Sequence, residues 1–257
     1  TSKARFAEWY TGTSLRRLLP VPAAALTSQR FWQHMSYLDA PQIAAIEQDL
    51  TTTLIKDFGV DLSCVLYDTT NFATFIDSFN DASTLAQRGK SKQKRSDLRL
   101  IGLALLVTRD FHIPLFHHVY AGNVHDAPTF ASVTEQLLDR YRLFARHVDG
   151  ITLVYDKGNN SLGNQQAVDD TPYHFVGSVS PVQHADLLAV PRDQFHALAG
   201  ADLAGTCAYR TRKTVLGADR TLVVTFNPEL FLTQSETILR ELRKATHRLH
   251  DLQRALS

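Results

Sequence analysis

Two aspartates follow apolar segments of similar sequence. Residues 64–67 lead into Asp68 and residues 151–155 lead into Asp156, so each strand-forming segment ends in Tyr-Asp. Two carboxylates that share a site repel each other unless a cation lies between them or one stays protonated. Mg²⁺ prefers carboxylate oxygens and water, and it leaves coordination positions for a phosphate. We therefore interpret Asp68 and Asp156 as catalytic ligands of Mg²⁺ or Mn²⁺. An aspartate after a strand also commonly caps a turn or helix, and this alternative stays open for both residues.

A basic segment follows the first acid. Its cations surround Gly89 and have Ser and Gln as neighbours rather than apolar residues, as is typical of a loop that contacts a phosphate backbone. The candidate DNA-binding residues are Arg88, Lys90, Lys92, Lys94 and Arg95. A solvated run of charge is the alternative, and for this segment alone it is the stronger interpretation.

The elements around the two acids predict an α/β fold. After the strand that ends at Asp68, the segments 98–108 and 114–120 form a hairpin. A helix from Asp126 to Tyr141, the strand before Asp156, a helix from Ser161 and a strand at 174–179 follow. This order predicts a mixed five-stranded sheet flanked by helices. In its ribonuclease-H-like version the first and fourth strands are central neighbours, which would bring Asp68 and Asp156 together.

Composition sets the broad class. The chain has 257 residues, of which 44% are hydrophobic, and this is enough for a sizeable core. Because no apolar run approaches the roughly 18 residues of a membrane span, we expect a soluble, cytoplasmic protein without membrane contact. Two cysteines, Cys64 and Cys207, predict no disulfide framework. The net charge of +1 means that only local clustering argues for a polyanionic partner.

Several motifs in order resemble the DDE transposases of bacterial insertion sequences. They comprise residues 67–72, Arg88 to Lys92 with 94–95 and 97–98, 113–115, 122–123 with Asp126, and Asp156 to Gly158 with 160–161. The resemblance implies a magnesium-dependent endonuclease that cleaves DNA at transposon ends and transfers the strand to a target during DNA recombination. It assigns the first and second catalytic acids to Asp68 and Asp156. It also implies DNA as a partner and self-association in a synaptic complex.

The chain departs from the pattern of this family at its third acid. The family has a glutamate within a Tyr, Arg, Glu, Lys series after a strand-rich insertion, and no such series occurs here. Glu236 and Glu241 lie in a Leu-periodic basic helix, and we reject them as this acid. We also expect the chain to lack the amino-terminal DNA-binding region typical of the family. We therefore expect a piece of a transposase that is inactive alone.

The domain organisation follows from the same comparison. We expect a helical segment at 1–60, the first part of the ribonuclease-H-like core at 61–181, a strand-rich insertion at 182–227 and a basic amphipathic helix at 228–257, with the core incomplete after 257. Two other functions stay open. One is a different magnesium-dependent phosphoryl-transfer enzyme, either a nuclease or a phosphatase with Asp68 as nucleophile. The other is a non-catalytic, DNA-binding transposase remnant.

Overall fold

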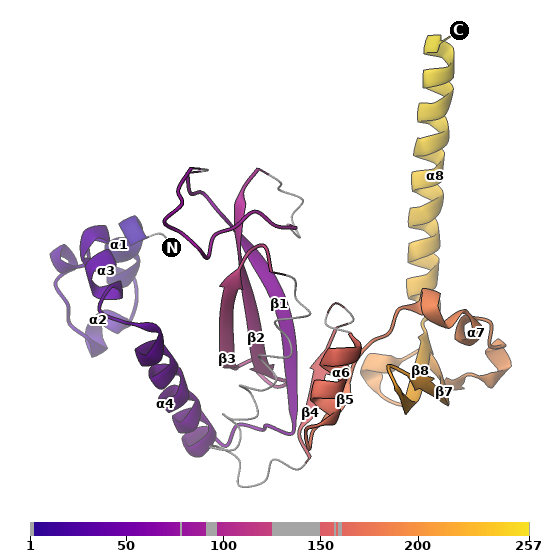
Figure 1. Ribbon diagram of the computed structural model, residues 1–257, viewed down its shortest axis with the longest axis horizontal. Helices are drawn as coiled ribbons and strands as arrows, with labels where there is room; N and C mark the ends of the chain where they lie inside the picture. Colours follow the sequence, from indigo (N-terminus) through magenta and orange to yellow (C-terminus); the bar gives the residue numbers. More distant parts are fainter. Residues whose placement is uncertain are drawn as a thin grey trace. The chain divides into compact units, whose positions relative to one another are not determined.

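The computed structural model describes residues 3–77, 79–90, 97–124, 150–156, 158 and 161–256. The chain divides into two compact units, one of Thr1–Tyr155 with Ala167–Val176 and one of Asp156–Gln166 with Gly177–Ser257 (Figure 1). The helix predicted from Asp126 to Tyr141 lies outside the described residues.

Helices make up the amino-terminal part of the first unit. They are the 3₁₀ helices η1 (Lys3–Arg5) and η2 (Ala23–Ala25) and the α-helices α1 (Phe6–Thr11), α2 (Leu15–Leu18), α3 (Ser28–Met35) and α4 (Ala40–Phe58). The longest of them is α4. Asp39 and Gln42 form a capping box, in which the side chain of each accepts the backbone N–H of the other at 2.9 Å. Gly59 ends α4 in the left-handed conformation, at φ 60°.

A mixed five-stranded sheet follows α4 in the first unit. Its strands are β1 (Cys64–Thr74), β2 (Arg99–Thr108), β3 (Pro114–Ala121), β4 (Thr152–Tyr155) and β5 (His174–Val176). They lie in the order β3-β2-β1-β4-β5. The strands β1, β2 and β3 pair antiparallel, whereas β1, β4 and β5 pair parallel. This confirms the predicted ribonuclease-H-like sheet, including the hairpin between β2 and β3 and the central position of the first and fourth strands.

The first strand is longer than predicted. We expected it to end at Asp68, but β1 continues to Thr74 because it stays paired with β2 as far as Thr74 and Arg99. The predicted fifth strand is shorter, since β5 ends at Val176 rather than at Val179. The hydrophobic core lies on one face of the sheet, and alternating residues of β1 and β2 contribute to it. Its members include Val65, Tyr67, Ala104, Leu106, Phe116, Leu153, Tyr155 and Val168.

The predicted short helix after Asp156 is present as α6 (Leu162–Asp169). The hydroxyl of Ser161 accepts the N–H of Asn164 at 3.0 Å, as a helix cap does. Both cysteines, Cys64 and Cys207, are free. No helix among the described ranges is long and apolar enough to cross a membrane.

The second unit contains a separate antiparallel sheet. Its strands are β6 (His196–Ala197), β7 (Cys207–Val215) and β8 (Ala218–Phe226), in the order β6-β7-β8. The short helices of this unit are η4 (Pro181–His184), α7 (Ala185–Leu188), η5 (Arg192–Gln194) and η6 (Ala201–Leu203). The strands β7 and β8 lie on either side of the turn at Gly217. The long helix α8 (Pro228–Leu256) follows.

Candidate functional site

The two Tyr-Asp motifs involve neighbouring central strands. β1 and β4 pair in parallel from Cys64 and Thr152 up to Tyr67 and Tyr155, which are register partners. Both tyrosines are buried in the core. The next residue is Asp68 in one motif and Asp156 in the other. The pairing between β1 and β4 therefore ends directly before the two acids, while β1 continues beside β2.

Asp68 is an exposed residue within β1. Its Oδ1 accepts the backbone N–H of Thr69 at 2.7 Å. Its register partner on β2 is Leu105, whose own partner on β3 is His117. Because direct partners across antiparallel strands present their side chains to the same face, these three residues form one row across the sheet. The face of this row is opposite to the one that carries Tyr67.

Helix α4 holds the outer end of this row. Glu47 Oε1 accepts the backbone N–H of His117 at 2.8 Å and lies 2.5 Å from His117 Nδ1. Four residues further along α4, the hydroxyl of Thr51 donates to the carbonyl of Leu115 at 3.3 Å. A carboxylate and a hydroxyl thus satisfy outward-facing backbone groups of the edge strand β3. Sequence reasoning missed Glu47, since its contact joins segments 70 residues apart.

Asp156 belongs to the second unit and is exposed. The hydroxyl of Ser178 donates to Asp156 Oδ1 at 3.2 Å. Sequence reasoning missed Ser178 because we expected the strand around it to continue to Val179. The available signal was Ser178 itself, a small polar residue two positions after the end of β5.

The beginning of the basic segment is attached to the sheet. Arg88 and Lys90 are both exposed, and Gly89 between them packs against the turn after β3. A Cβ at Gly89 would lie 1.9 Å from the carbonyl oxygen of Gly122, so no larger residue fits there. Asn71 of β1 donates from Nδ2 to the carbonyl of Lys90 at 3.2 Å. The remaining predicted DNA-binding residues, Lys92, Lys94 and Arg95, lie outside the described residues.

Backbone hydrogen bonds strengthen this attachment. Gln87 and Leu100 each donate an N–H to the carbonyl of the other, at 3.0 and 2.7 Å. Gly122 donates to the carbonyl of Leu85 at 3.1 Å. Asn71 lies three residues after Asp68, and this corresponds to about 10 Å along a strand. The attached start of the basic segment is therefore about 10 Å from the first candidate acid along β1.

Two exposed phenylalanines lie on the connection between β1 and the basic segment. Phe75 is 87% exposed and Phe79 is 90% exposed. Arg99 donates from Nη1 to the carbonyl of Asn80 at 2.6 Å, which holds this connection at the start of β2. Exposed aromatic rings beside cations can stack on nucleic-acid bases. We did not predict a role for either ring, although two aromatic residues in a polar connection were a signal.

The part of the chain that the structure describes includes both candidate acids. No group of three His, Cys, Asp or Glu side chains that could hold a metal occurs among those residues. Glu241, one of the two glutamates rejected from the sequence, lies on α8 and forms an ion pair with Lys244 at 2.8 Å.

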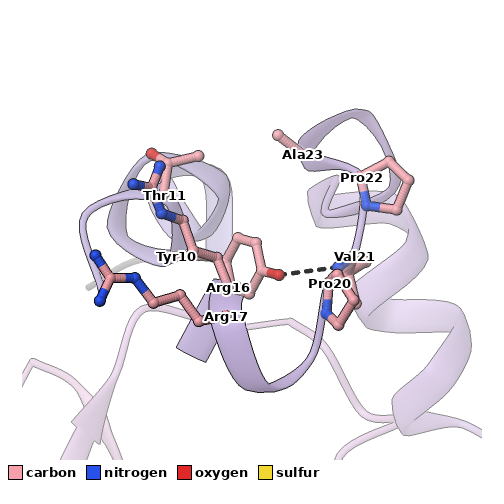
Figure 2. A pocket seen from close by; sticks show the side chains of 8 residues that line it. All are labelled: Tyr10, Thr11, Arg16, Arg17, Pro20, Val21, Pro22 and Ala23. Atoms are coloured by element: carbon pink, nitrogen blue, oxygen red, sulfur yellow. Dashed lines mark hydrogen bonds between the residues drawn. The ribbon is translucent and has the colours of Figure 1, made fainter. Parts of the chain in front are cut away.

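An open pocket of about 480 Å³ lies in the amino-terminal helical part of the first unit (Figure 2). Tyr10 links its walls, because the tyrosine hydroxyl donates to the carbonyl of Leu19 and accepts the N–H of Val21 at 2.9 Å. Arg16 and Arg17 contribute two cations to the lining. None of the predicted site residues lies in this pocket.

Comparison with known proteins gives similarity to solved structures only. No family model and no curated protein matches the chain. A Mos1 transposase paired-end complex with the left transposon end has a TM-score of 0.32 and 8% identity, and the match covers 68% of this chain and 58% of that chain. A piggyBac transposase synaptic complex with hairpin DNA has a TM-score of 0.38 and 11% identity, covering 87% and 47%. A Mos1 mariner paired-end complex with Mn has a TM-score of 0.29 and 10% identity, covering 70% and 60%.

The chain thus spans about half to three fifths of the length of these solved transposase chains. Because every TM-score is below 0.5, we base the proposed function on the residues of this chain.

Proposed function

We propose that the chain is part of the catalytic core of a DNA transposase of the bacterial insertion-sequence type. In this proposal Asp68 and Asp156 hold Mg²⁺ or Mn²⁺, and the basic segment from Arg88 to Arg95 binds DNA. The reaction is cleavage of a DNA strand at a transposon end, followed by transfer of the freed 3′-hydroxyl to a target strand. A third acid has to complete the metal site, so the 257-residue chain is expected to be inactive alone.

The register between Tyr67 and Tyr155 carries the proposal. On parallel neighbours, residues at the same level of the sheet lie next to each other, and the two acids are the next residues of their motifs. Open α/β sheets bind their ligands near the carboxyl ends of parallel strands, and the parallel pairing of β1 with β4 ends directly before the two acids. The chemistry of the donors fits as well, since both are carboxylates and Asp68 accepts only one hydrogen bond, at Oδ1, within the described part of the chain.

The roles of the residues follow from their charge and position. Bound Mg²⁺ ions would supply an activated attacking oxygen and stabilise the leaving oxygen of the phosphodiester. Asp68 and Asp156 would hold and position these ions. The hydrogen bond from Ser178 would orient the Asp156 carboxylate. Arg88 and Lys90, attached through Gly89 to the sheet, would contact backbone phosphates and so position the DNA without reading its sequence.

Metal binding provides the test, because the two proposed carboxylates can be examined by it separately from catalysis. We expect the chain to bind Mn²⁺ in titrations followed by electron paramagnetic resonance of the free ion. Asp68→Asn and Asp156→Asn should each weaken this binding at least about tenfold, which corresponds to about 1.4 kcal/mol. Asp202→Asn is the matched control, because Asp202 is an exposed acid of the second unit outside the proposed site.

Unchanged Mn²⁺ affinity in Asp156→Asn would refute the two-acid site. If the chain then still bound duplex DNA with strong salt dependence, the function would be non-catalytic DNA binding. A phospho-aspartyl intermediate trapped at Asp68 would instead identify a phosphatase.

A further inference from the structure

The long helix α8 packs little against the rest of the second unit. Its 29 residues include none that is buried, and Figure 1 shows it extending away from β7 and β8. Ile238 is 60% exposed and Leu249 is 65% exposed, although both are large apolar side chains. In proteins, a helix gains most of its stability from the packing of its apolar face. Within the second unit, the leucines of α8 thus form an apolar surface that is available to a partner helix.

The spacing of these residues identifies the kind of surface. Apolar residues recur at alternating steps of four and three, at Ile238, Leu242, Ala245, Leu249, Leu252 and Leu256. A mean step of 3.5 residues is the period of a coiled-coil seam, in which the stripe stays turned toward a partner helix. From first to last this stripe is about 27 Å long at 1.5 Å per residue. The surface thus fits a second α-helix with the same period.

The charges beside the seam indicate what the second helix is and how it runs. Glu241 and Arg248 are exposed, and both occupy the heptad position directly before a seam leucine. In an antiparallel pair of two copies, with Leu242 opposite Ala245, Glu241 of each copy faces Arg248 of the other. The twofold symmetry makes this ion pair twice. In a parallel pair the same two residues would face Thr246 and Gln253, which carry no charge.

The ion pairs within the chain are consistent with this arrangement. Glu241 pairs with Lys244 at 2.8 Å and lies 3.7 Å from Arg240, whereas Arg248 has no acidic partner among the described residues. The remaining cations, such as Arg243, lie away from the seam. With Leu242 opposite Ala245, the charge pattern is self-complementary in the antiparallel arrangement, and the parallel arrangement offers no such pair.

We propose that α8 binds α8 of a second copy of this chain as an antiparallel two-stranded coiled coil. The proposal names α8 as the helix through which the expected self-association takes place. It does not rest on the proposed DNA chemistry, because dimerisation is measured without DNA or metal. If the Mn²⁺ experiment failed, the proposed dimer would be unaffected. If the chain did not dimerise, the proposed metal site would be unaffected.

Sedimentation equilibrium of the 257-residue chain tests whether the surface is used. We expect a concentration-dependent dimer of twice 28.8 kDa. Leu249→Glu should weaken dimerisation at least about 100-fold, since it introduces two charges into the seam. Arg243→Glu changes charge on the same helix outside the seam and should leave the dimer unchanged. Far-ultraviolet circular dichroism with the variants at high concentration checks that the rest of the chain is folded.

Charge variants test the direction of the helices. Glu241→Arg and Arg248→Glu should each weaken the homodimer about tenfold, because each places like charges opposite one another. An equimolar mixture of these two variants should form a heterodimer at least as tight as the unmodified dimer, because both cross-pairs are then attractive.

A chain that stays monomeric up to about 100 μM would overturn the proposal, and so would a dimer that tolerates Leu249→Glu. A dimer that is insensitive to both charge variants, or equally sensitive to Arg243→Glu, would overturn the antiparallel arrangement.

Discussion

Replacing Glu47 by alanine should loosen the edge strand β3. The Glu47 carboxylate accepts the backbone N–H of His117 at 2.8 Å and lies 2.5 Å from its ring nitrogen. Loss of a hydrogen bond to a charged acceptor costs about 1.5 to 3 kcal/mol when the donor is left without a partner. The side chain of His117 is 37% exposed, so solvent reduces the ion-pair contribution to well below about 1 kcal/mol. We expect a loss of local stability of about 2 to 3 kcal/mol.

Amide hydrogen exchange of β3, measured by mass spectrometry, reports this loss directly. A loss of 2 to 3 kcal/mol corresponds to exchange about 30- to 150-fold faster in the segment 114–121, when exchange is limited by local opening. Glu47→Gln keeps an oxygen acceptor and should show a smaller effect. Asp49→Ala is the control, since it removes the same charge from an exposed position of α4. If Glu47→Ala and Asp49→Ala accelerated exchange equally, the contact with His117 would not stabilise the strand, and our reasoning would be refuted.

Two further predictions concern the sheet. Burial, and to a smaller extent the neighbouring His117, lowers the pKa of His118 in the folded chain. As the pH falls below about 6.5, His118 is therefore protonated in the unfolded chain before it is protonated in the folded chain, and the stability of the fold decreases. His118→Gln should reduce the loss of stability against urea between pH 7 and 5. His174→Gln, at an exposed position of β5, should lose as much stability as the unmodified chain over the same pH range. Equal pH slopes in the unmodified chain and both variants would contradict the prediction. Gly89→Ala should destabilise the fold by about 1 to 3 kcal/mol in urea unfolding, because the added Cβ would meet the Gly122 carbonyl at 1.9 Å. Gly163→Ala, where the Cβ meets nothing within 4 Å, should be neutral or stabilising, and the close approach is unimportant if the two variants behave alike.

The order of the sheet could be predicted from the sequence because each step has a local signal. Alternating apolar residues, a hairpin connection and helix caps are all encoded within short segments. The length of β1 could not be predicted in this way. Asp68 is unfavourable in a strand, but the pairing of the residues after it with β2 outweighs this local preference.

The pairing of the strands that lead to Asp68 and Asp156 was predicted, whereas the contacts of Glu47 and Ser178 were not. Each acid follows a recognisable apolar segment, and the strands pair as the predicted fold requires. Glu47 and Ser178 depend on contacts between distant segments, over 70 and 22 residues of sequence. Such contacts have no periodic pattern, so only the folded structure identifies them.

The attachment of the basic segment to the sheet has a practical consequence. Gly89 contacts Gly122 through the main chain, and Gln87 pairs with Leu100 by backbone hydrogen bonds alone. Main-chain contacts are indifferent to the identity of neighbouring side chains, so the glycines rather than the cations set where the segment starts. Lys90 can therefore be exchanged for another residue while these main-chain contacts persist. An engineer could vary the charge at this position, and so test the proposed contact with DNA, without changing the sheet that positions it.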